Sequence, residues 1–594
     1  MACAIAAVVA LVLAGGREAK AVVGSNSGTN IFDGVYVNRL IGADAFYNWG
    51  FSGSRAIVAN IEAGAIWDGH ESLSGRVSQF IADPTIVATG TTQLGQYDWH
   101  ATMVGQTIGG SGQYTAQVGI APTAQLWSGA IATSWSGAGF SGSFTISNES
   151  FLYPYVTAMR TGITSGTSTL KAHVINSSWG YADPAGIVDW TIAIDALARE
   201  NNVVNVVAAG NDGLAEGKVG GPASGYNGIA VAAMTGDTLS PPFSQVASFS
   251  SRGPGNFYNP ATNTTSTNAR PTIDIAAPGD NLTLALYGGT TGGNLTGSNP
   301  WPAASYYYPD IQGTSFAAPI VAGGAALLVD AGQLFVGANA AAAEMLDARV
   351  IKATMMAGAT ATNGWNNGQA SVNGVITTSQ ALDNTVGAGV INLDNAYRIY
   401  IGDPFGYTSN GVTYIQAGVN TTLGLIGLEG GGEIALRGWD LGSVVSDTGA
   451  NGSVNSYAFG PALAAGDILN VALTWFAERT LGTTIDSALD VALSNLSLEV
   501  WRADGLGGES LVATSVSDYS TTEFLRVVLP TAGDYSLRVV GLDQVYNLST
   551  SETPTSDTSY GLAWSVIVVP EPTTLLLLVL GSGVLAVQRR RCRP

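Results

Sequence analysis

Short apolar segments alternate with amphipathic segments between residues 56 and 403. Segments with the composition of buried strands are 56–61, 126–131, 173–176, 203–209, 229–233 and 273–276. Apolar residues recur at helical spacing in the segments 187–200, 320–330 and 340–356. Because strands that alternate with helices build parallel sheets, this pattern predicts an α/β domain with helices on both faces of one parallel sheet.

The pattern changes after residue 404, where apolar and polar residues alternate with a period of two. Leu496, Leu498 and Val500 fall on one face of such a segment, and residues 535–539 repeat the alternation. Gly-Asp pairs precede two of these segments, at 466–467 and 533–534. This region therefore predicts an all-β antiparallel sandwich, jelly-roll-like in topology.

The chain of 594 residues is too long for one hydrophobic core, since single cores rarely exceed about 300 residues. The changes in pattern divide it into five segments. We expect a signal peptide at 1–21, an N-terminal extension at 22–55, an α/β domain at 56–403, a β-sandwich domain at 404–568 and a C-terminal tail at 569–594.

The N-terminal segment has the features of a signal peptide. An apolar run at 4–16 is too short to span a bilayer, and Ala19-Lys20-Ala21 has the small residues of a cleavage site. We expect cleavage after Ala21 and export. The positively charged stretch that usually precedes such a run is missing, which means that either the start codon is misplaced or the signal is weak. A buried N-terminal strand is the alternative.

The C-terminal segment combines Pro570-Glu571-Pro572, an apolar stretch at 573–587 and an arginine cluster at 589–593. The arginines are expected to stay on the cytoplasmic side of a membrane. This order resembles the PEP-CTERM sorting signal of Gram-negative bacteria. The resemblance implies membrane contact through a transmembrane helix, processing by an exosortase-type enzyme, and a final location at the cell envelope, the cell surface or outside the cell. An ordinary tail anchor is the alternative.

Charge and cysteine content exclude some partners. The formal charge is −20, and only 11% of residues are charged, so an acidic surface argues against nucleic acid. Acidity also keeps a secreted protein soluble. The two cysteines, Cys3 and Cys592, lie in the segments expected to be removed, which leaves the mature protein without disulfides or cysteine zinc sites.

A serine and a histidine are candidates for nucleophilic catalysis. Ser315 stands in a small-residue turn before a helical segment, where free N–H groups and the helix dipole favour an oxyanion. A serine hydroxyl needs a base of near-neutral pKa. Of His70, His100 and His173, His100 opens a small-residue helix and fits that role. His173 opens a predicted strand and His70 lies in a polar turn, which favours structural roles.

Two further polar residues follow predicted strands. Asn211 follows the strand 203–209 and could donate its NH2 to an oxyanion, although an Asn-Asp-Gly turn needs no function. Glu62 ends the strand 56–61 and could hold the imidazole of His100. Asp68, in a turn six residues later, is the rival acid.

These residues lie in motifs that resemble the subtilase family (peptidase S8) over residues 36–400. Ser315 lies in G-T-S-F-A-A-P, which matches the family signature G-T-S-x-A-x-P, and His100 lies in a close variant of H-G-T-x-V-A-G with departures at Ala101 and Gln106. Supporting matches are A-A-G-N at 208–211, N-S-S-W-G at 176–180, V-G-I-A-P at 118–122, A-S-F-S-S at 247–251, I-A-A-P-G at 275–279 and G-A-G-V-I-N at 387–392.

The resemblance implies a role for each residue. Ser315 would be the nucleophile, His100 the general base and Asn211 the oxyanion-hole donor. Peptide substrate would bind along Ser178, Trp179, Gly180, Ala209 and Gly210. The chain order acid, His, Asn, Ser is that of subtilisins.

One residue departs from the family, because Glu62 replaces the family's Asp as the triad acid. Glutamate and aspartate have similar intrinsic pKa values, but the longer side chain must fold back to reach His100. A misplacement of about 1 Å can cost on the order of 10²-fold in rate. A sedolisin, with Glu as the base, is excluded because His100 and Asn211 fill positions that differ in that family.

The sequence thus predicts a secreted serine endopeptidase that forms an acyl-enzyme on Ser315. The alternative is a surface binding or structural protein on a subtilase fold that Glu62 has weakened. A lipase or esterase lacks its G-x-S-x-G motif at Ser315. The chemistry needs no cofactor, and structural Ca²⁺ is only what the resemblance implies, since no Asp-rich loop has calcium-binding spacing. The segment 22–55 is too short for the usual folded propeptide.

Overall fold

The computed structural model of the chain describes residues 37–87, 96–111, 118–136, 143–290, 292–295, 304–338, 340–378, 380–401, 407–409, 412–414, 431–446, 452–549 and 557–569. The expected signal peptide and the sorting tail from Pro570 onward lie outside these residues. The predictions for both ends therefore stay predictions.

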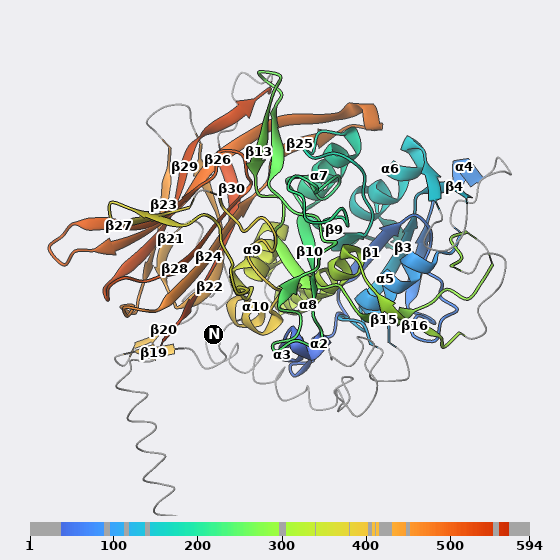
Figure 1. Cartoon of the computed structure of the whole chain (residues 1–594), viewed down its shortest axis with the longest axis horizontal. Helices are drawn as coiled ribbons and strands as arrows, with labels where there is room; N and C mark the ends of the chain where they lie inside the picture. The colour runs from blue at the N-terminus through green and yellow to red at the C-terminus, as the bar shows by residue number, and fades with distance from the viewer. Residues whose placement is uncertain are drawn as a thin grey trace, which may run out of the picture.

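The first part of the chain is built around one mostly parallel sheet (Figure 1). The sheet pairs its strands in parallel except for β11, which runs antiparallel to β10. Its strand order is β11 (Gln245–Val246), β10 (Ile229–Thr235), β9 (Val204–Ala208), β8 (Val174–Ser177), β1 (Ile57–Glu62), β3 (Gln125–Ala130) and β2 (Val77–Ile81), with β14 (Ile275–Pro278) paired to β10. The strands lie where the apolar segments predict them.

Helices cover both faces of this sheet, as predicted. Val58 of β1 joins a core cluster with residues of α5 (Trp99–Gly109), α8 (Thr314–Ala338) and α9 (Ala348–Gly358). Its neighbour Ala59 points the other way and joins a cluster with α6 (Asn148–Val156) and α7 (Asp189–Asn201). Successive residues of a strand face opposite sides, so the near-continuous apolar strands feed both clusters.

The remaining elements of this part are short. The helices are α2 (Val37–Leu40), α3 (Asp44–Tyr47), α4 (Pro84–Val87), η4 (Thr157–Thr161), η5 (Ala340–Leu346) and α10 (Leu393–Tyr400). Antiparallel pairs are β4 (Ala132–Ser136) with β5 (Ser143–Ile146), β6 (Ile163–Ser165) with β7 (Ser168–Leu170), β12 (Gly255–Asn259) with β13 (Thr264–Arg270), β15 (Leu282–Ala285) with β16 (Tyr307–Ile311), and β19 (Tyr407–Ser409) with β20 (Val412–Tyr414).

The residues from 431 onward, here called the C-terminal β part, form two facing sheets. One has the order β22 (Arg437–Val445), β30 (Asp557–Ile567), β24 (Ile468–Trp475), β28 (Thr522–Val528), all antiparallel. The other contains β21 (Gly431–Ile434), β23 (Val454–Phe459), β29 (Tyr535–Asn547), β26 (Ala488–Ala503), β25 (Glu478–Leu481) and β27 (Glu509–Val516), with η6 (Ile485–Ser487) before β26. Leu496, Leu498 and Val500 enter the core between the sheets, as their alternation predicts.

Two strands from the predicted catalytic range join this second sheet. The hairpin of β17 (Ala370–Val372) and β18 (Val375–Thr377) pairs with β27, more than 130 residues later in the chain, Ile376 facing Ala513. Sequence periodicity gives no sign of this pairing, because it depends on contact between distant segments.

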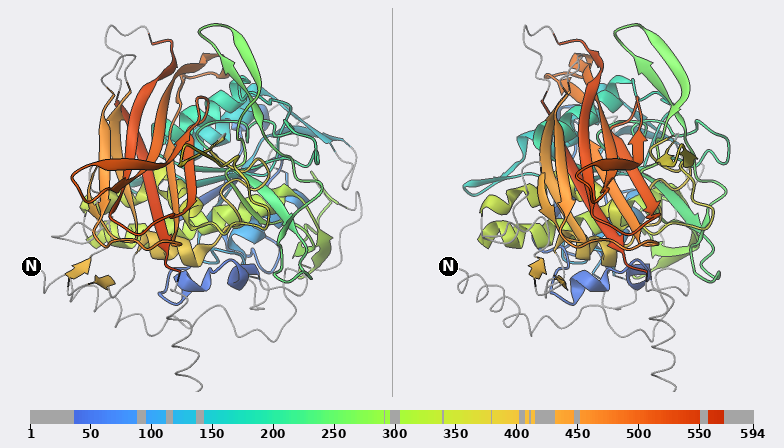
Figure 2. Two further views of the ribbon diagram at one scale, coloured as in Figure 1. Left: turned by 60° about the vertical axis from the view of Figure 1, so that its left-hand side comes forward. Right: turned by 90° about the vertical axis from the view of Figure 1, so that its left-hand side faces the viewer.

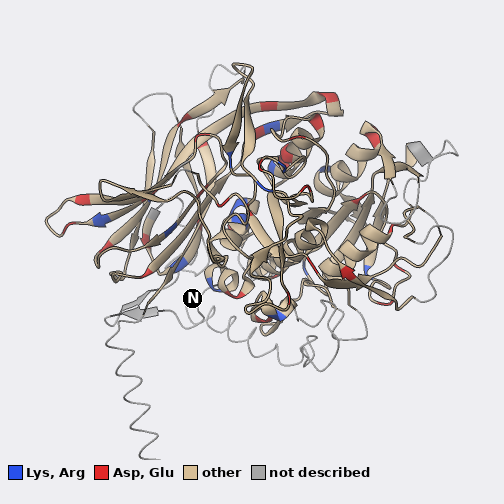
Figure 3. Cartoon of the chain, viewed as in Figure 1, with Lys and Arg blue, Asp and Glu red and all other residues tan. Residues whose placement is uncertain are grey.

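The two parts pack closely, as the views in Figure 2 agree. Helix α9 lies against β24 and β30, and α7 lies against β25 and β26. Trp439, Ala472, Phe524 and Ala563 of the C-terminal β part belong to the same apolar cluster as α8 and α9. Because this cluster contains residues of both parts, the interface is a continuous core rather than a loose contact between tethered units. Lys and Arg positions are scattered over both parts in the view of Figure 3.

Within the described ranges, one helix is long and apolar enough to cross a membrane by length and composition. It is the segment Thr314–Gly337 of α8, and 72% of its most apolar window is buried inside the protein. Residues of this segment belong to the hydrophobic core of the first part of the chain.

Candidate active site

The predicted site residues meet at the carboxyl edge of the parallel sheet. Glu62 is the last residue of β1, Ser178 follows β8, and Asn211 lies three residues after the end of β9. The helices α5 and α8 bring His100 and Ser315, each the second residue of its helix, to the same edge. Parallel strands end side by side, so residues more than 250 positions apart become neighbours here.

The side chains of Glu62 and His100 form a direct hydrogen bond. Oε2 of Glu62 lies 3.1 Å from Nδ1 of His100, and Oε1 accepts the backbone N–H of Ser178 at 2.9 Å. The Glu62 side chain is 1% exposed and that of His100 is 21% exposed. Both carboxylate oxygens are thus engaged, so the longer side chain is held in one orientation.

The electrostatics of His100 follow from this contact. Burial lowers the pKa of His100, but the charge and hydrogen bond of Glu62, helped by the charge of Asp98, outweigh burial and raise the pKa above its usual value. Nδ1 faces a carboxylate and is therefore the protonated nitrogen. Nε2 of the neutral ring is then left with its lone pair to accept a proton.

The rival acid, Asp68, has a different neighbour. Its Oδ1 accepts the hydroxyl of Tyr97 at 3.4 Å. In the described structure the carboxylate at Nδ1 of His100 belongs to Glu62. The sequence alone left open whether Glu62 or Asp68 contacts His100.

Ser315 lies at the buried start of α8, beside the histidine. Its hydroxyl donates to the backbone carbonyl of Ser178 at 3.0 Å. The ring of the next residue, Phe316, lies 5.4 Å from the His100 ring between centroids, which places the imidazole next to the first turn of α8.

The side chain of Asn211 is hydrogen-bonded to Thr314, the residue before Ser315. Its Oδ1 accepts both the backbone N–H of Thr314 at 2.9 Å and the Thr314 hydroxyl at 3.0 Å. Oγ1 of Thr314 in turn accepts the N–H of Gly210 at 3.1 Å. Because a backbone N–H can only donate, the amide orientation is fixed, and Nδ2 lies 3.6 Å from where a Cβ on Gly313 would stand. The amide NH2 is therefore held at the N-terminus of α8.

The predicted substrate residues form two backbone segments at this edge. Trp179 is anchored by its indole N–H, which donates to the carbonyl of Ile61 at 3.1 Å. Gly180 approaches the carbonyl of Gly221 so closely that an added Cβ would lie 3.0 Å from it. Gly210, after Ala209, has φ +103° and an added Cβ there would lie 2.9 Å from the Ser251 hydroxyl. Glycine is thus required at 210 by both conformation and space.

The other two histidines have structural partners, in line with the sequence interpretation. His70 contacts the Ser72 hydroxyl at 2.9 Å and the Tyr306 carbonyl at 2.9 Å, and burial lowers its pKa to about 4. His173 accepts the N–H of Ile57 at 3.0 Å, and burial lowers its pKa as well. The His70 ring thus joins two loop segments, and the His173 ring joins the backbone of β1 to the side chain of Gln333 in α8.

Asp98 also belongs to the site, although no sequence motif assigns it a role. It is the N-cap of α5, and its carboxylate accepts the N–H groups of His100 at 3.2 Å and Ala101 at 3.3 Å. Burial raises the pKa of Asp98 to about 6, against the lowering effect of His100. The signal was available, because an Asp directly before a helical segment is a typical N-cap.

In the part of the chain that the structure describes, no group of three or more His, Cys, Asp and Glu side chains is arranged to hold a metal ion. Ca²⁺ is also bound by backbone and amide carbonyls, so this finding does not test the Ca²⁺ that the resemblance implied. It stays an untested expectation.

Comparison with known proteins gives the family. A model of the subtilase family, peptidase S8, matches residues 53–389. The match covers more than half of the chain, which therefore belongs to the subtilase family of serine-type endopeptidases.

Relatives that carry the names of proteases are similar over about half of this chain. Subtilisin Savinase of Lederbergia lenta is 28% identical over 287 residues, which are 48% of this chain and 80% of Savinase. An alkaline protease of Shouchella clausii is also 28% identical over 287 residues, but only 57% of its length is matched. Subtilisin E of Bacillus subtilis is 28% identical over 291 residues, 49% of this chain and 59% of its own. The solved structure of the prenylagaramide maturation protease PagA superposes with a TM-score of 0.39 at 23% identity, over 60% of this chain and 96% of PagA.

Proposed function

We propose that this protein is a secreted serine endopeptidase with Ser315 as nucleophile, His100 as general base and Glu62 as the acid of the triad. One observation carries the proposal: Oε2 of Glu62 lies 3.1 Å from Nδ1 of His100, beside the first turn of the helix that bears Ser315. The family of the chain supports the same chemistry.

The reaction begins when a peptide occupies the site and the Ser315 hydroxyl turns from Ser178 to His100. Nε2 of His100 takes the hydroxyl proton as Oγ forms a bond to the scissile carbonyl carbon. The negative charge moves to the carbonyl oxygen, within reach of the Asn211 NH2 and the Ser315 N–H. Donors held in place before the reaction stabilise this charge without reorganising.

The tetrahedral intermediate collapses by breaking the peptide C–N bond. His100 gives its proton to the departing amine, which leaves an acyl-enzyme on Ser315 and a neutral imidazole. A water molecule then attacks the ester carbon while Nε2 takes one of its protons. The second collapse breaks the Oγ–C bond, returns the proton to Oγ and releases a carboxylic acid.

Glu62 acts by stabilising the imidazolium that forms in each step. Its carboxylate keeps the proton on Nδ1, so Nε2 is the basic atom and faces the serine. The Ser178 N–H holds the second oxygen, which prevents the carboxylate from turning away. The longer side chain of glutamate is thus held by two hydrogen bonds, one to each carboxylate oxygen, from His100 and from the Ser178 N–H.

Peptide backbone is the substrate feature that these segments fit. Main-chain groups line the edge of the site on two sides. One side is formed by Ser178, Trp179 and Gly180, and the other by Ala209 and Gly210. An extended peptide can add to such an edge as a strand. We propose protein or peptide substrates bound in this way, with no cofactor required.

The finer aspects of location and architecture belong to the same proposal. We propose export through the signal peptide at 1–21 and processing of the tail at 569–594 by an exosortase-type enzyme of a Gram-negative bacterium. The jelly-roll-like description of the C-terminal β part is proposed from its two facing sheets, which are antiparallel except where β21 pairs with β23 and β18 pairs with β27.

A serine-directed fluorophosphonate probe, combined with hydrolysis of a denatured protein substrate, tests the proposal. The wild-type protein is expected to be labelled at Ser315 and to cleave the substrate. Ser315→Ala is expected to lose both while keeping its circular dichroism spectrum and Tm. Labelling that persists in Ser315→Ala would show another nucleophile. A folded wild type that neither reacts nor cleaves would instead favour a weakened subtilase-fold binding protein.

A further inference from the structure

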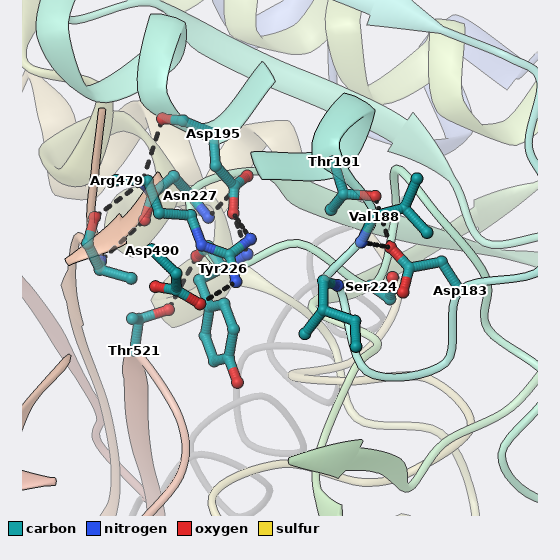
Figure 4. A network of polar contacts seen from close by, with 12 residues as sticks. Asp183, Val188, Thr191, Asp195, Ser224, Tyr226, Asn227, Arg479, Asp490 and Thr521 are labelled. Atoms are coloured by element: carbon teal, nitrogen blue, oxygen red, sulfur yellow. Dashed lines mark hydrogen bonds and ion pairs between the residues drawn. The ribbon is translucent and has the colours of Figure 1, made fainter. Parts of the chain in front are cut away.

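An arginine of the C-terminal β part is buried inside the interface with the peptidase part (Figure 4). Arg479 of β25 has a fully buried side chain, and it pairs with Asp195 of α7 at 3.0 Å and with Asp490 of β26 at 2.9 Å. A buried ion pair is costly to break, because removal of one partner leaves an uncompensated charge. Arg479 thus ties the two parts together at a fixed point.

The same guanidinium covers an aromatic ring of the peptidase part. Arg479 lies 4.8 Å from the ring centre of Tyr226, and Arg270 at the end of β13 lies 4.1 Å from it. Tyr226 thus contacts one arginine from each part. Such contacts favour a single position of the ring.

Tyr226 belongs to the loop 220–227, and bonds from both parts hold this loop. Asp195 accepts the N–H groups of Tyr226 at 2.6 Å and Asn227 at 3.2 Å. From the C-terminal β part, the Thr521 hydroxyl donates to the Tyr226 carbonyl at 2.7 Å. The Asn227 amide and the backbone of Ala477 bond each other reciprocally, at 3.0 and 2.8 Å.

The other end of this loop lies against the proposed substrate segment. The N–H of Tyr181, next to Gly180, donates to the carbonyl of Gly221 at 2.8 Å. The Tyr181 hydroxyl bonds Thr191 of α7 at 2.7 Å. An added Cβ on Gly220 would lie 2.2 Å from the Tyr181 carbonyl, so the two backbones are in contact. Movement of the loop would therefore displace the segment that carries Trp179 and Gly180.

We propose that Arg479 is a positioning residue of the peptidase: through Asp195 and Tyr226 it holds the loop 220–227, and with it the wall of the substrate groove at Trp179 and Gly180. The C-terminal β part is then a component of the substrate-binding site and not only an appended module. This inference rests on the proposed function, since the groove is that of the proposed endopeptidase.

Two variants of the full-length chain separate this role from general stability. Arg479→Met removes the ion pairs, and Thr521→Val removes a single hydrogen bond to the loop with little change in shape. Arg526→Met is the control for the first. Arg526 also crosses the interface, donating to the carbonyls of Ala359 at 2.9 Å and Ala388 at 3.3 Å, away from the loop.

Thr558→Val is the control for the second variant. Its hydroxyl bonds Ser494 within the C-terminal β part at 2.7 Å. Thr521→Val should still fold if Arg479→Met does not, because a single neutral hydrogen bond is a small part of the interface.

Peptide KM, probe labelling of Ser315 and hydrogen exchange of 220–227 are the measurements. Thr521→Val is expected to raise KM roughly two- to tenfold, the factor that one hydrogen bond is worth, and Arg479→Met more. The labelling rate should change little, because the small probe does not need the groove wall. Exchange of 220–227, measured in the Ser315→Ala background to prevent autolysis, should be faster in both variants than in the controls.

The proposal would be overturned if each variant behaved like its control. That result is an equal KM and an equal exchange rate of 220–227 in Arg479→Met and Arg526→Met, and likewise in Thr521→Val and Thr558→Val. The exchange measurement does not depend on activity. If the wild type has no peptidase activity, the proposed function fails, and exchange of 220–227 still decides whether Arg479 positions the loop.

Discussion

Glu62 bonds His100 through one carboxylate oxygen, at 3.1 Å from Nδ1, while its other oxygen accepts the N–H of Ser178. Ser178 also accepts the hydroxyl of Ser315 through its carbonyl. A single backbone residue therefore contacts both the acid and the nucleophile of the proposed triad. The geometry at Glu62 is set by two bonds whose lengths suit a glutamate.

Glu62→Gln is expected to lower kcat by about 10⁴, the loss that follows when the triad acid becomes an amide and the wrong histidine tautomer is stabilised. The amide can present its NH2 to Nδ1, which leaves Nε2 protonated and unable to act as a base. Peptide hydrolysis with active-site titration measures the effect. Asp68→Asn is the control. If Asp68→Asn lost activity and Glu62→Gln did not, the triad acid would be Asp68.

Glu62→Asp is expected to lower activity, although aspartate is the residue found in the family. A shorter side chain cannot keep both the His100 and the Ser178 bond from the same backbone position. A displacement of about 1 Å costs on the order of 10²-fold in rate. A rise in kcat in Glu62→Asp would mean that the backbone is adapted to aspartate and that the natural protein is a weakened enzyme.

Asn211→Leu is expected to lower kcat by about 10²–10³ with little change in KM, the loss known for an oxyanion donor of this kind in a subtilisin. The amide NH2, held by the bonds of its Oδ1 to Thr314, acts mainly on the charge that develops in the transition state. Steady-state kinetics with one peptide substrate separates the two constants. An effect confined to KM would assign Asn211 to substrate binding.

Asp98→Asn is expected to move the acid limb of the kcat/KM profile to lower pH. The negative charge of Asp98 contributes to the raised pKa of His100, so its removal lowers that pKa, and the base stays deprotonated to lower pH. Asparagine still caps α5, which keeps the helix in place. Asp347→Asn, at the N-cap of α9, is the matched control, and an acid limb that moves equally in both would contradict the role of Asp98.

Glu523→Gln is expected to stabilise the protein more at pH 8 than at pH 5. Glu523 is fully buried on β28, and burial raises its pKa to about 8, against the hydrogen bonds from Ser515 and Ser517. Since the folded pKa lies above the unfolded value of 4.5, the stability is fully present below pH 4.5 and is lost as the pH rises through about 8.

The gain from Glu523→Gln should reach the order of a few kcal/mol at alkaline pH. Thermal unfolding of Ser315→Ala and its Glu523→Gln derivative between pH 5 and 8 measures it. Glu499→Gln, on the partly exposed face of β26, is the control. A Tm difference that stays constant with pH would show that Glu523 does not take up a proton on folding.

Deletion of residues 570–594 is expected to release the mature protein into the medium, because the apolar stretch and the arginine cluster are the proposed means of retention. Cell fractionation with an antibody to the peptidase part detects the change. Intact-mass measurement of the natural mature form supplies the second readout. A mature protein that keeps Arg589 to Arg591 would rule out processing of the tail.

The parallel sheet, the helices on its two faces and the identity of most candidate site residues could be predicted from the amino-acid sequence alone. Short apolar runs such as 56–61, which alternate with helical segments, are typical of strands in a sheet covered on both faces, so their positions could be predicted from the sequence. Ser315, His100 and Asn211 were identified because short motifs surround them. Asp98 could also have been found, since N-capping depends on a few consecutive residues.

Contacts between distant segments could be seen only in the three-dimensional structure. It placed Glu62 rather than Asp68 at His100, paired β18 with β27, and buried Arg479 of the C-terminal β part against Asp195 of the peptidase part. Hydrophobic periodicity records which face of an element is buried but not which partner covers it, because burial is non-directional. Partner choice comes from the packing of whole elements and from hydrogen bonds and ion pairs that form only once those elements have met.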